Sequence, residues 1–264
     1  MPYETFLYDL TDGLATIRLN RPRTLNSLTF EVYAELVRAT HDLRDDDAVR
    51  AVLITGEGRG FCSGGDVHEI IGELQKRDTQ GLLAFTRLTG ELTKGLLTIG
   101  KPTVAAINGI AAGAGTVIAC SCDLRLGTPL TKFGFVFTRV GLTGADMGIA
   151  YLLPRLVGLA KATELLYLGD IVEADEALRI GLLNRLVQPE ELETAARALA
   201  TRLAQGPTFA MRMTKELIHK EYGMDLNAAI ELEAQAQALC MQTLDHREGY
   251  QSFVEKRSPE FVGR

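Results

Sequence analysis

Two glycine-rich loops constrain the fold of this 264-residue chain more than any other feature. The loop "GRGFCSGGD" (58–66) follows the apolar run "VRAVLITG" (49–56), and the loop "NGIAAGAG" (108–115) follows "KPTVAAI" (101–107). Apolar runs that end in small residues are typical of strands buried in a parallel sheet. Each loop leads into a predicted helix, so the chain contains repeated strand–loop–helix units. These units predict an α/β fold in which helices pack on a sheet.

The rest of the chain fits the same architecture. A further buried strand is predicted at "CDLRLGT" (122–128) and a short apolar strand around 184–187. Helical spacing is expected over 29–44, over most of 66–99, over 113–120 and over most of the chain after Gly148. The apolar positions of the helix at 29–44 are Phe30, Tyr33, Leu36, Val37 and Leu43. The first strands are expected at Glu4–Asp9 and Leu14–Leu19, and the last helices at Pro207–Tyr222, Leu226–Thr243 and Asp245–Lys256.

Charge and cysteine content bear on partners and location. The formal net charge is −6, with acidic and basic residues mixed along the chain. Nucleic-acid binding needs clustered Lys and Arg, so we expect no nucleic-acid partner. No apolar run reaches the roughly 18 residues of a membrane span, and "MPYETFLYDL" at the N-terminus is too charged for a signal peptide. Four cysteines do not make a disulfide framework and fit a reducing cytoplasm.

Three motifs that suggest other chemistry fail on inspection. The stretch "GLLTIGKP" (95–102) resembles a phosphate-binding loop, but Pro102 replaces the hydroxyl residue that would hold Mg²⁺. The G-x-G at 113–115 lacks the third glycine of a dinucleotide fingerprint. Cys120 and Cys122 have no second cluster, so we expect core residues and no metal site. Surface positions on helices are expected for the four histidines, His41, His68, His219 and His246.

The two glycine-rich loops offer backbone chemistry instead. Between Gly109 and Cys122, only Cys120 carries a side chain that titrates near neutral pH. The first N–H groups of a helix have no acceptor within that helix, and two such groups converging on one point form an oxyanion hole. The alternative is that the glycines only allow strand and helix to pack closely.

Five stretches in order resemble the enoyl-CoA hydratase/isomerase superfamily, whose members share the crotonase fold. They cover nearly the whole chain and are "LNRPRTLNSLT" (19–29), "GRGFCSGGD" (58–66), "KPTVAAINGIAAGAG" (101–115), "LLPRLVG" (152–158) and "REGYQSFVEKRSP" (247–259). The resemblance implies a crotonase-like superhelix of repeated ββα turns in residues 1–200. It implies that the helical region 201–264 assembles homotrimers, often stacked as hexamers. It also implies an acyl-CoA thioester as substrate and no separate cofactor, because coenzyme A is part of the substrate.

The resemblance assigns roles to individual residues. The oxyanion hole would consist of the backbone N–H groups of Cys62 and Ala114, which would stabilise a thioester enolate. Arg23 falls where relatives often place a cation near the CoA phosphates, although a solvated loop charge explains it equally well. The residues expected to line the adenine and pantetheine path, mainly through their backbone, are Ser63, Gly64, Gly65 and Asp66. Further substrate contacts are expected from Gly113, Val117 and Phe137.

The chain departs from the family's hydratases at two positions. A typical hydratase of this family adds water with two glutamates. The corresponding positions here, three residues past Ala114 and four before Gly141, hold Val117 and Phe137. Hydrocarbon side chains have no exchangeable hydrogen. The two-glutamate mechanism therefore cannot be carried over to this chain.

Asp146, nine residues before Arg155, is the acid that remains in this part of the pattern. Dienoyl-CoA and 1,2-epoxyphenylacetyl-CoA isomerases use an aspartate at this place for proton transfer, and chlorobenzoyl-CoA dehalogenases use it as nucleophile. "GLTGAD" has one residue more between glycine and aspartate than those relatives. Val117 and Phe137 would form an apolar wall that perturbs the pKa of Asp146, and Tyr151 would lie one helical turn beyond it. The alternative role for Asp146 is a helix N-cap.

Because it lacks both glutamates, the chain resembles the isomerases of the family. The predicted activity is acyl-CoA isomerisation through an enolate, in which Asp146 takes a proton and returns it elsewhere on the acyl group. Two alternatives stay open. One is an enoyl-CoA hydratase, a lyase, in which Asp146 acts with an unidentified partner; the other is a catalytically silent acyl-CoA-binding protein. The segment that shapes the acyl pocket in this family suggests an aliphatic or aromatic acyl group, since it holds Leu74, Leu82, Phe85 and Leu88.

Overall fold

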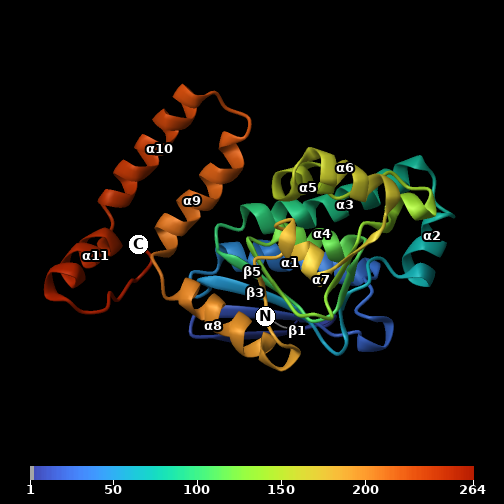
Figure 1. Cartoon of the computed structure of the whole chain (residues 1–264), viewed down its shortest axis with the longest axis horizontal. Coiled ribbons are helices and arrows are strands. Elements are labelled where there is room, and N and C mark those ends of the chain that lie inside the picture. Colours follow the sequence, from blue (N-terminus) through green and yellow to red (C-terminus); the bar gives the residue numbers. More distant parts are fainter. Residues whose placement is uncertain (1–2) are drawn as a thin grey trace.

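The computed structural model of the chain describes residues 3–264 and has helices packed on two β-sheets (Figure 1). The predicted α/β class is therefore confirmed. Met1 and Pro2, which begin the stretch in which no signal peptide is expected, lie outside the described residues. Within residues 3–264, no helix is long and apolar enough to cross a membrane.

Neighbouring strands are parallel in both sheets, except for the antiparallel pairs β1–β2 and β8–β9. The larger sheet has the order β1-β2-β3-β5-β7-β10, with β1 (Phe6–Thr11), β2 (Leu14–Leu19), β3 (Ala51–Gly56), β5 (Thr103–Ile107), β7 (Leu124–Gly127) and β10 (Arg185–Leu186). The smaller sheet has the order β4-β6-β8-β9, with β4 (Gly60–Cys62), β6 (Ile110–Ala112), β8 (Lys132–Gly134) and β9 (Ile171–Glu173). The helices are α1 (Phe30–Asp45), α2 (Gly72–Leu74), α3 (Thr79–Thr98), α4 (Ala114–Ser121), α5 (Ile149–Val157), α6 (Leu159–Leu168), α7 (Ala174–Arg179), α8 (Leu192–Ala204), α9 (Thr208–Glu221), α10 (Leu226–Met241) and α11 (Leu244–Glu255).

The larger sheet is covered on both faces, which explains why β3 is buried along its whole length. Successive side chains of a strand point to opposite faces. Val52 and Ile54 belong to the main core cluster, which also contains buried residues of α1, α3 and α4. Ala51 and Leu53 belong to a second cluster formed with α8. The sheet is thus the middle layer, and the glycine-rich loops leave it on the side of α4.

The smaller sheet is the main difference from the sequence-based expectation. Its strands have three residues each, too few for an alternation of apolar and polar residues to be visible. The predicted helical segment 66–99 is also interrupted at 75–78. Asp78 restarts the helix, because its Oδ1 accepts a hydrogen bond of 2.8 Å from the N–H of Gly81.

The last three helices form a C-terminal arm (α9 to α11) that projects from the core (Figure 1). Lys215 of α9 is 7% exposed and connects the arm to the core. Its ammonium donates to Asp123 Oδ2 at 2.9 Å and to the carbonyl oxygens of Leu96 and Lys101 at 3.0 and 3.2 Å. The division of function between residues 1–200 and 201–264 stays a prediction.

Candidate active site

The two glycine-rich loops lie side by side. β4 and β6 pair in parallel, with Cys62 opposite Ala111, so the residues that follow them emerge at the same edge of the smaller sheet. The loops touch through their backbones. A Cβ atom added to Gly64 would lie 2.9 Å from the carbonyl oxygen of Ala112 and 3.5 Å from the nitrogen of Ala114. Glycine is therefore required at this position for the two loops to approach each other.

The N–H of Ala114 points out of the start of α4. Gly113 precedes the helix with φ 52° and ψ −122°, a conformation that side chains rarely permit. Within residues 3–264, the N–H of Ala114 has no hydrogen-bond acceptor, as is normal for the first residue of a helix. The positive end of the α4 dipole strengthens such a donor. Ala114 can therefore donate to a ligand oxygen, which is the role predicted for it.

The side chain of Cys62 takes no part in this chemistry. Cys62 is completely buried, and burial raises the pKa of its thiol to about 12. Such a thiol stays protonated at neutral pH and is a poor nucleophile. Any contribution of Cys62 to a site therefore comes from its backbone. Cys120 and Cys122 are buried in the same core cluster, as expected for core residues.

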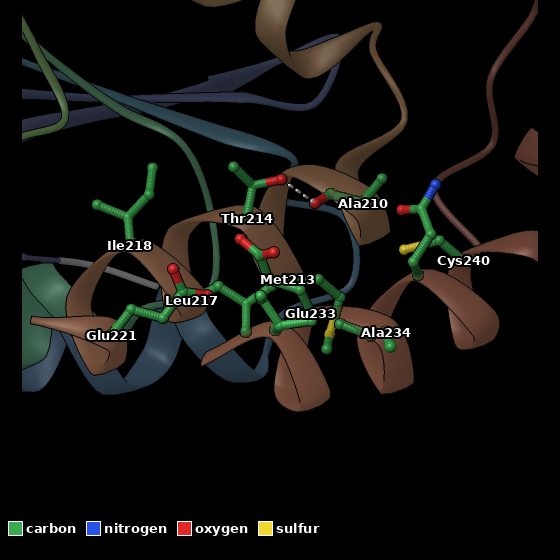
Figure 2. Close-up of a pocket in the computed structure, with 12 residues that line it drawn as sticks. Ala210, Met213, Thr214, Leu217, Ile218, Glu221, Glu233, Ala234 and Cys240 are labelled. Atoms are coloured by element: carbon green, nitrogen blue, oxygen red, sulfur yellow. Dashed lines mark hydrogen bonds between the residues drawn. The ribbon is translucent and has the colours of Figure 1, made fainter. Parts of the chain in front are cut away.

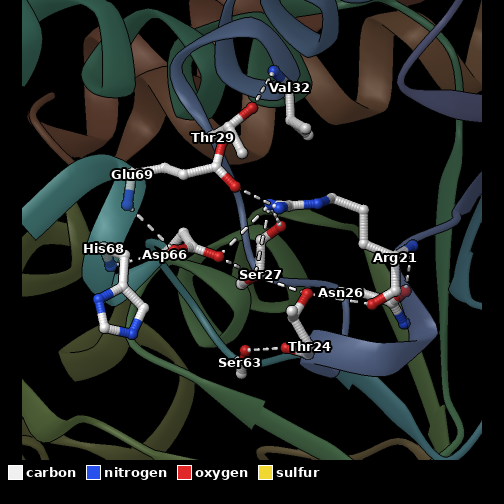
Figure 3. A network of polar contacts seen from close by, with 10 residues as sticks. All are labelled: Arg21, Thr24, Asn26, Ser27, Thr29, Val32, Ser63, Asp66, His68 and Glu69. Atoms are coloured by element: carbon white, nitrogen blue, oxygen red, sulfur yellow. Dashed lines mark hydrogen bonds and ion pairs between the residues drawn. The ribbon is translucent and has the colours of Figure 1, made fainter.

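The side chain of Asp66 is fully engaged within the protein (Figure 3). It accepts hydrogen bonds from the Ser27 hydroxyl at 2.8 Å and from the backbone N–H groups of His68 and Glu69 at 3.0 and 3.1 Å. The Glu69 N–H, followed by the Ser27 hydroxyl, holds the pKa of Asp66 below its usual range. The Ser63 hydroxyl is also used internally, since it donates to the carbonyl oxygen of Thr24 at 2.9 Å. Contacts of Ser63 and Asp66 with a substrate would thus fall to their backbone, and such contacts stay a prediction.

Arg21 and Asn26, which no sequence motif singled out, hold the first loop in place (Figure 3). The Asn26 amide donates to the carbonyl oxygens of Gly60 at 2.8 Å and Glu57 at 3.0 Å. Arg21 pairs with Glu69 at 2.7 Å and, more weakly, with Asp66 at 3.6 Å. Asn26 has φ 57°, a region that asparagine tolerates better than most residues. An asparagine inside "LNRPRTLNSLT" was the available signal for such a turn.

Arg23 is exposed on the short turn Pro22–Thr24 and makes no ion pair with any residue in 3–264. Both explanations of this residue, a CoA contact and a solvated charge, fit that placement. Of the segment expected to shape the acyl pocket, Leu74, Phe85 and Leu88 pack against the core cluster, whereas Leu82 is 39% exposed.

Val117 and Phe137 are hydrocarbon groups of the main core cluster. Val117 of α4 is completely buried and Phe137 is 7% exposed, and both belong to the cluster that contains Cys62 and Ala114. This cluster offers no proton donor or acceptor at either position.

Asp146 lies in the loop before α5 and is partly buried. Its Oδ1 accepts a hydrogen bond of 2.9 Å from the N–H of Met147. Burial raises the pKa of Asp146, and the Met147 N–H opposes this rise only in part. The helix N-cap alternative is wrong, because Gly148 occupies that position at the start of α5. Tyr151 lies in α5, and its hydroxyl donates to the carbonyl oxygen of His219 in the arm at 3.4 Å.

Comparison with known proteins supports the family resemblance of these loops. A sequence model of the family described as Enoyl-CoA hydratase/isomerase matches residues 9–264. The chain belongs to this family. It is 35% identical to a crotonyl-CoA hydratase from Syntrophomonas wolfei, with 100% of both chains covered. It is also 35% identical to the 1,2-epoxyphenylacetyl-CoA isomerase of Escherichia coli K12, with 99% of both covered.

Solved structures confirm the crotonase-like fold. A crystal structure of a Streptomyces coelicolor A3(2) protein, provisionally assigned as an enoyl-CoA hydratase, superposes with a TM-score of 0.97. The two chains are 50% identical, and the match covers 100% of this chain and 96% of the other. Membership makes the chain an enzyme of the enoyl-CoA hydratase/isomerase superfamily, and an acyl-CoA substrate is consistent with it.

Proposed function

We propose that the chain is an acyl-CoA isomerase that works through a thioester enolate, with Asp146 as its single acid/base. One observation carries the proposal. Val117 and Phe137 occupy both positions where family hydratases hold glutamates, and Asp146 is the partly buried carboxyl in this part of the chain. A single carboxyl is enough to shuttle a proton, whereas addition of water across a double bond uses two groups.

The reaction follows from these groups. The Asp146 carboxylate takes a proton from the carbon next to the thioester carbonyl, and the electron pair of that C–H bond moves onto the thioester oxygen. The N–H groups of Cys62 and Ala114 donate to this oxygen, where one such donor is commonly worth about 10²–10³ in rate. The Asp146 carboxylic acid then returns the proton to another carbon, which shifts the double bond. A raised pKa brings Asp146 closer to neutral pH and makes both transfers easier.

A second candidate is an enoyl-CoA hydratase, favoured by the likeness to the Syntrophomonas wolfei protein named crotonyl-CoA hydratase. In that case Asp146 would position water together with an unidentified partner. A silent acyl-CoA-binding protein is the third candidate. It would bind acyl-CoA tightly and exchange no substrate proton with solvent.

The first experiment is proton exchange from deuterated water into a saturated acyl-CoA, because it tests the enolate step whatever the product. The second compares Asp146→Asn with the unchanged chain on 3-enoyl-, dienoyl- and ring-epoxide-CoA substrates. We expect a loss of about 10²–10⁴ in turnover, the usual contribution of a general acid–base group. Asp170→Asn, at an exposed carboxyl paired with Arg139, is the matched control.

Each rival predicts a different result. Undiminished turnover by Asp146→Asn would exclude the role of this residue. Loss of absorbance of crotonyl-CoA on addition of the protein would favour the hydratase. Tight binding without any exchange would favour the silent binder.

The arm supports a further part of the proposal, assembly into homotrimers or dimers of trimers. A groove of about 560 Å³ lies between α9 and α10, lined by apolar residues such as Met213 and Leu217 (Figure 2). Apolar side chains of the arm are widely exposed in the single chain, with Phe253 at 83% and Leu226 at 74%. Exposed apolar surface of this kind marks protein interfaces. Light scattering tests the assembly, and Phe253→Asp is expected to shift it toward smaller species.

A further inference from the structure

Tyr33, near the start of α1, is a buried phenol that the proposed reaction does not use. The residue is 3% exposed, and its ring packs edge-on against Phe85, with ring centroids 5.5 Å apart. Phe85 belongs to the segment expected to shape the acyl pocket. A Cβ atom added to Gly65 would lie 4.0 Å from the Tyr33 oxygen. The hydroxyl thus faces the loop that carries the Cys62 N–H.

The Tyr33 hydroxyl makes no hydrogen bond to any residue in 3–264, whereas Tyr3 and Tyr151 donate to Asp42 and to His219. The Tyr33 oxygen is not a fully buried atom either, because it does not belong to the side-chain oxygens and nitrogens in 3–264 that have neither exposed surface nor a partner. The ring is therefore enclosed by protein while the oxygen keeps contact with open space. Because polar groups in protein interiors are almost always paired, this hydroxyl is available to pair with water or with a ligand from outside the chain.

The protonation state of Tyr33 follows from its burial. Burial raises the pKa of Tyr33 far above its ordinary value. Tyr33 stays protonated wherever Asp146 is functional. It is therefore a hydrogen-bond donor to a ligand and not a second base.

We propose that Tyr33 determines specificity by donating a hydrogen bond to an oxygen of the acyl group itself, beyond the thioester. The proposal rests on the isomerase function above and narrows its substrate class. That class consists of acyl-CoA esters whose chain or ring carries an epoxide, carbonyl or hydroxyl oxygen. A purely hydrocarbon acyl group leaves the donor unpaired, and sites built to bind an oxygen reject analogues that lack it.

The test is Tyr33→Phe, which keeps the ring and its contact with Phe85. Two substrates with the same number of acyl carbons are compared, ring-1,2-epoxyphenylacetyl-CoA and 3-octenoyl-CoA. We expect kcat/KM to fall about tenfold or more for the epoxide and to change less than about twofold for the octenoyl ester, since one lost hydrogen bond discriminates strongly. Tyr3→Phe removes a hydroxyl that is bound to Asp42 and should alter neither value.

A binding measurement separates this proposal from the proposed function. Calorimetry with hydroxyphenylacetyl-CoA and phenylacetyl-CoA needs no turnover. Tyr33→Phe should weaken only the hydroxylated ligand, by about tenfold. Equal weakening of both ligands, or of neither, would overturn the assignment of Tyr33. Absence of proton exchange in the unchanged chain, with this difference in binding intact, would overturn the isomerase function and leave the role of Tyr33 standing.

Discussion

Gly115 lies so close to Cys62 that a Cβ atom at position 115 would collide with the Cys62 carbonyl oxygen. This contact joins the first turn of α4 to β4. It therefore holds the N-terminus of α4, where the Ala114 N–H lies, against β4 by backbone packing alone. The glycines of "NGIAAGAG" thus allow strand and helix to pack closely. The predicted pair of N–H donors depends on this close packing, so the two explanations of the glycines are compatible.

The substitution Gly115→Ala is expected to reduce activity strongly. The added methyl meets backbone atoms, which cannot rotate away, so β4 and α4 must separate. A displacement of about 1 Å at a catalytic group typically costs on the order of 10² in rate. The measurement is kcat/KM together with the rate of proton exchange from deuterated water.

Gly90→Ala is the matched control for this substitution. Gly90 lies within α3, and an added Cβ meets no other atom of residues 3–264 within 4 Å outside the helix backbone. Alanine is the better helix former, so this variant should gain about 0.5–1 kcal/mol of stability and keep its activity. Wild-type exchange by Gly115→Ala would contradict the proposed donor geometry.

Asp66→Ala is expected to weaken acyl-CoA binding with little effect on kcat at saturation. The substitution removes the acceptor for the Ser27 hydroxyl and for two N–H groups of the turn that follows, at a cost of about 1–3 kcal/mol. Loosening of this loop raises KM first, because its predicted contacts are with the CoA part of the substrate. Glu73→Gln is the control, since Glu73 lies in an exposed pair with Lys76 and surface pairs contribute only about 0–1 kcal/mol.

The effect of Asp66→Ala on the free energy of unfolding should depend on pH in a defined direction. The pKa of Asp66 is lowered in the folded state, so its stabilisation is present above the ordinary value of about 3.9 and is lost as pH falls through the folded pKa. The difference in unfolding free energy between the unchanged chain and Asp66→Ala should therefore shrink in acid. A difference that grows in acid would contradict the hydrogen bonds assigned to Asp66.

The sequence predicts the parts of the site whose chemistry is local. The loops at 58–66 and 108–115 follow long apolar strands, and the hydrocarbon character of Val117 and Phe137 is visible from position alone. The environment of a side chain, in contrast, depends on residues that are far away in the sequence. Tyr33 fits the apolar positions of its helix, and only the fold brings its hydroxyl toward Gly65.

The burial of Asp146 has the same origin. Its surroundings are built from segments that are distant in the sequence. The sequence therefore also allowed Asp146 to be a helix N-cap, whereas in the structure it precedes the N-cap residue Gly148. The strands of the smaller sheet were missed because three-residue strands are defined by their partners and not by a pattern of their own.

Lys215→Met is expected to loosen the arm. It leaves Asp123 with its two hydrogen bonds from Thr103 but without the cation at 2.9 Å. Breaking a buried ion pair costs about 3–5 kcal/mol, and we expect the lower part of this range because the Asp123 side chain is 28% exposed. Limited proteolysis should cut the arm sooner, and the proposed trimer should dissociate at higher protein concentration. Lys220→Met, at an exposed pair with Glu216, should change little.

Asp146→Asn should stabilise the fold at neutral pH while it slows the proposed reaction by about 10²–10⁴. Burial raises the pKa of Asp146 in the folded state, so its favourable contribution is complete below the unfolded value of about 3.9 and is lost as pH rises through the folded pKa. Above that range the charged carboxylate opposes folding. Asparagine carries no charge and keeps an oxygen that can accept the Met147 N–H.

The measurement is the melting temperature of both proteins at pH 4 and pH 7. The variant should melt higher at pH 7, by about 2–4 °C for each kcal/mol in a chain of this size, and the gap should narrow at pH 4. Asp170→Asn, at an exposed site, should show no such gain at pH 7. A variant that melts lower than the unchanged chain at pH 7 would mean that the Asp146 carboxylate supports the fold. A gain in stability together with a loss of turnover is the result expected of a carboxyl retained for its chemistry.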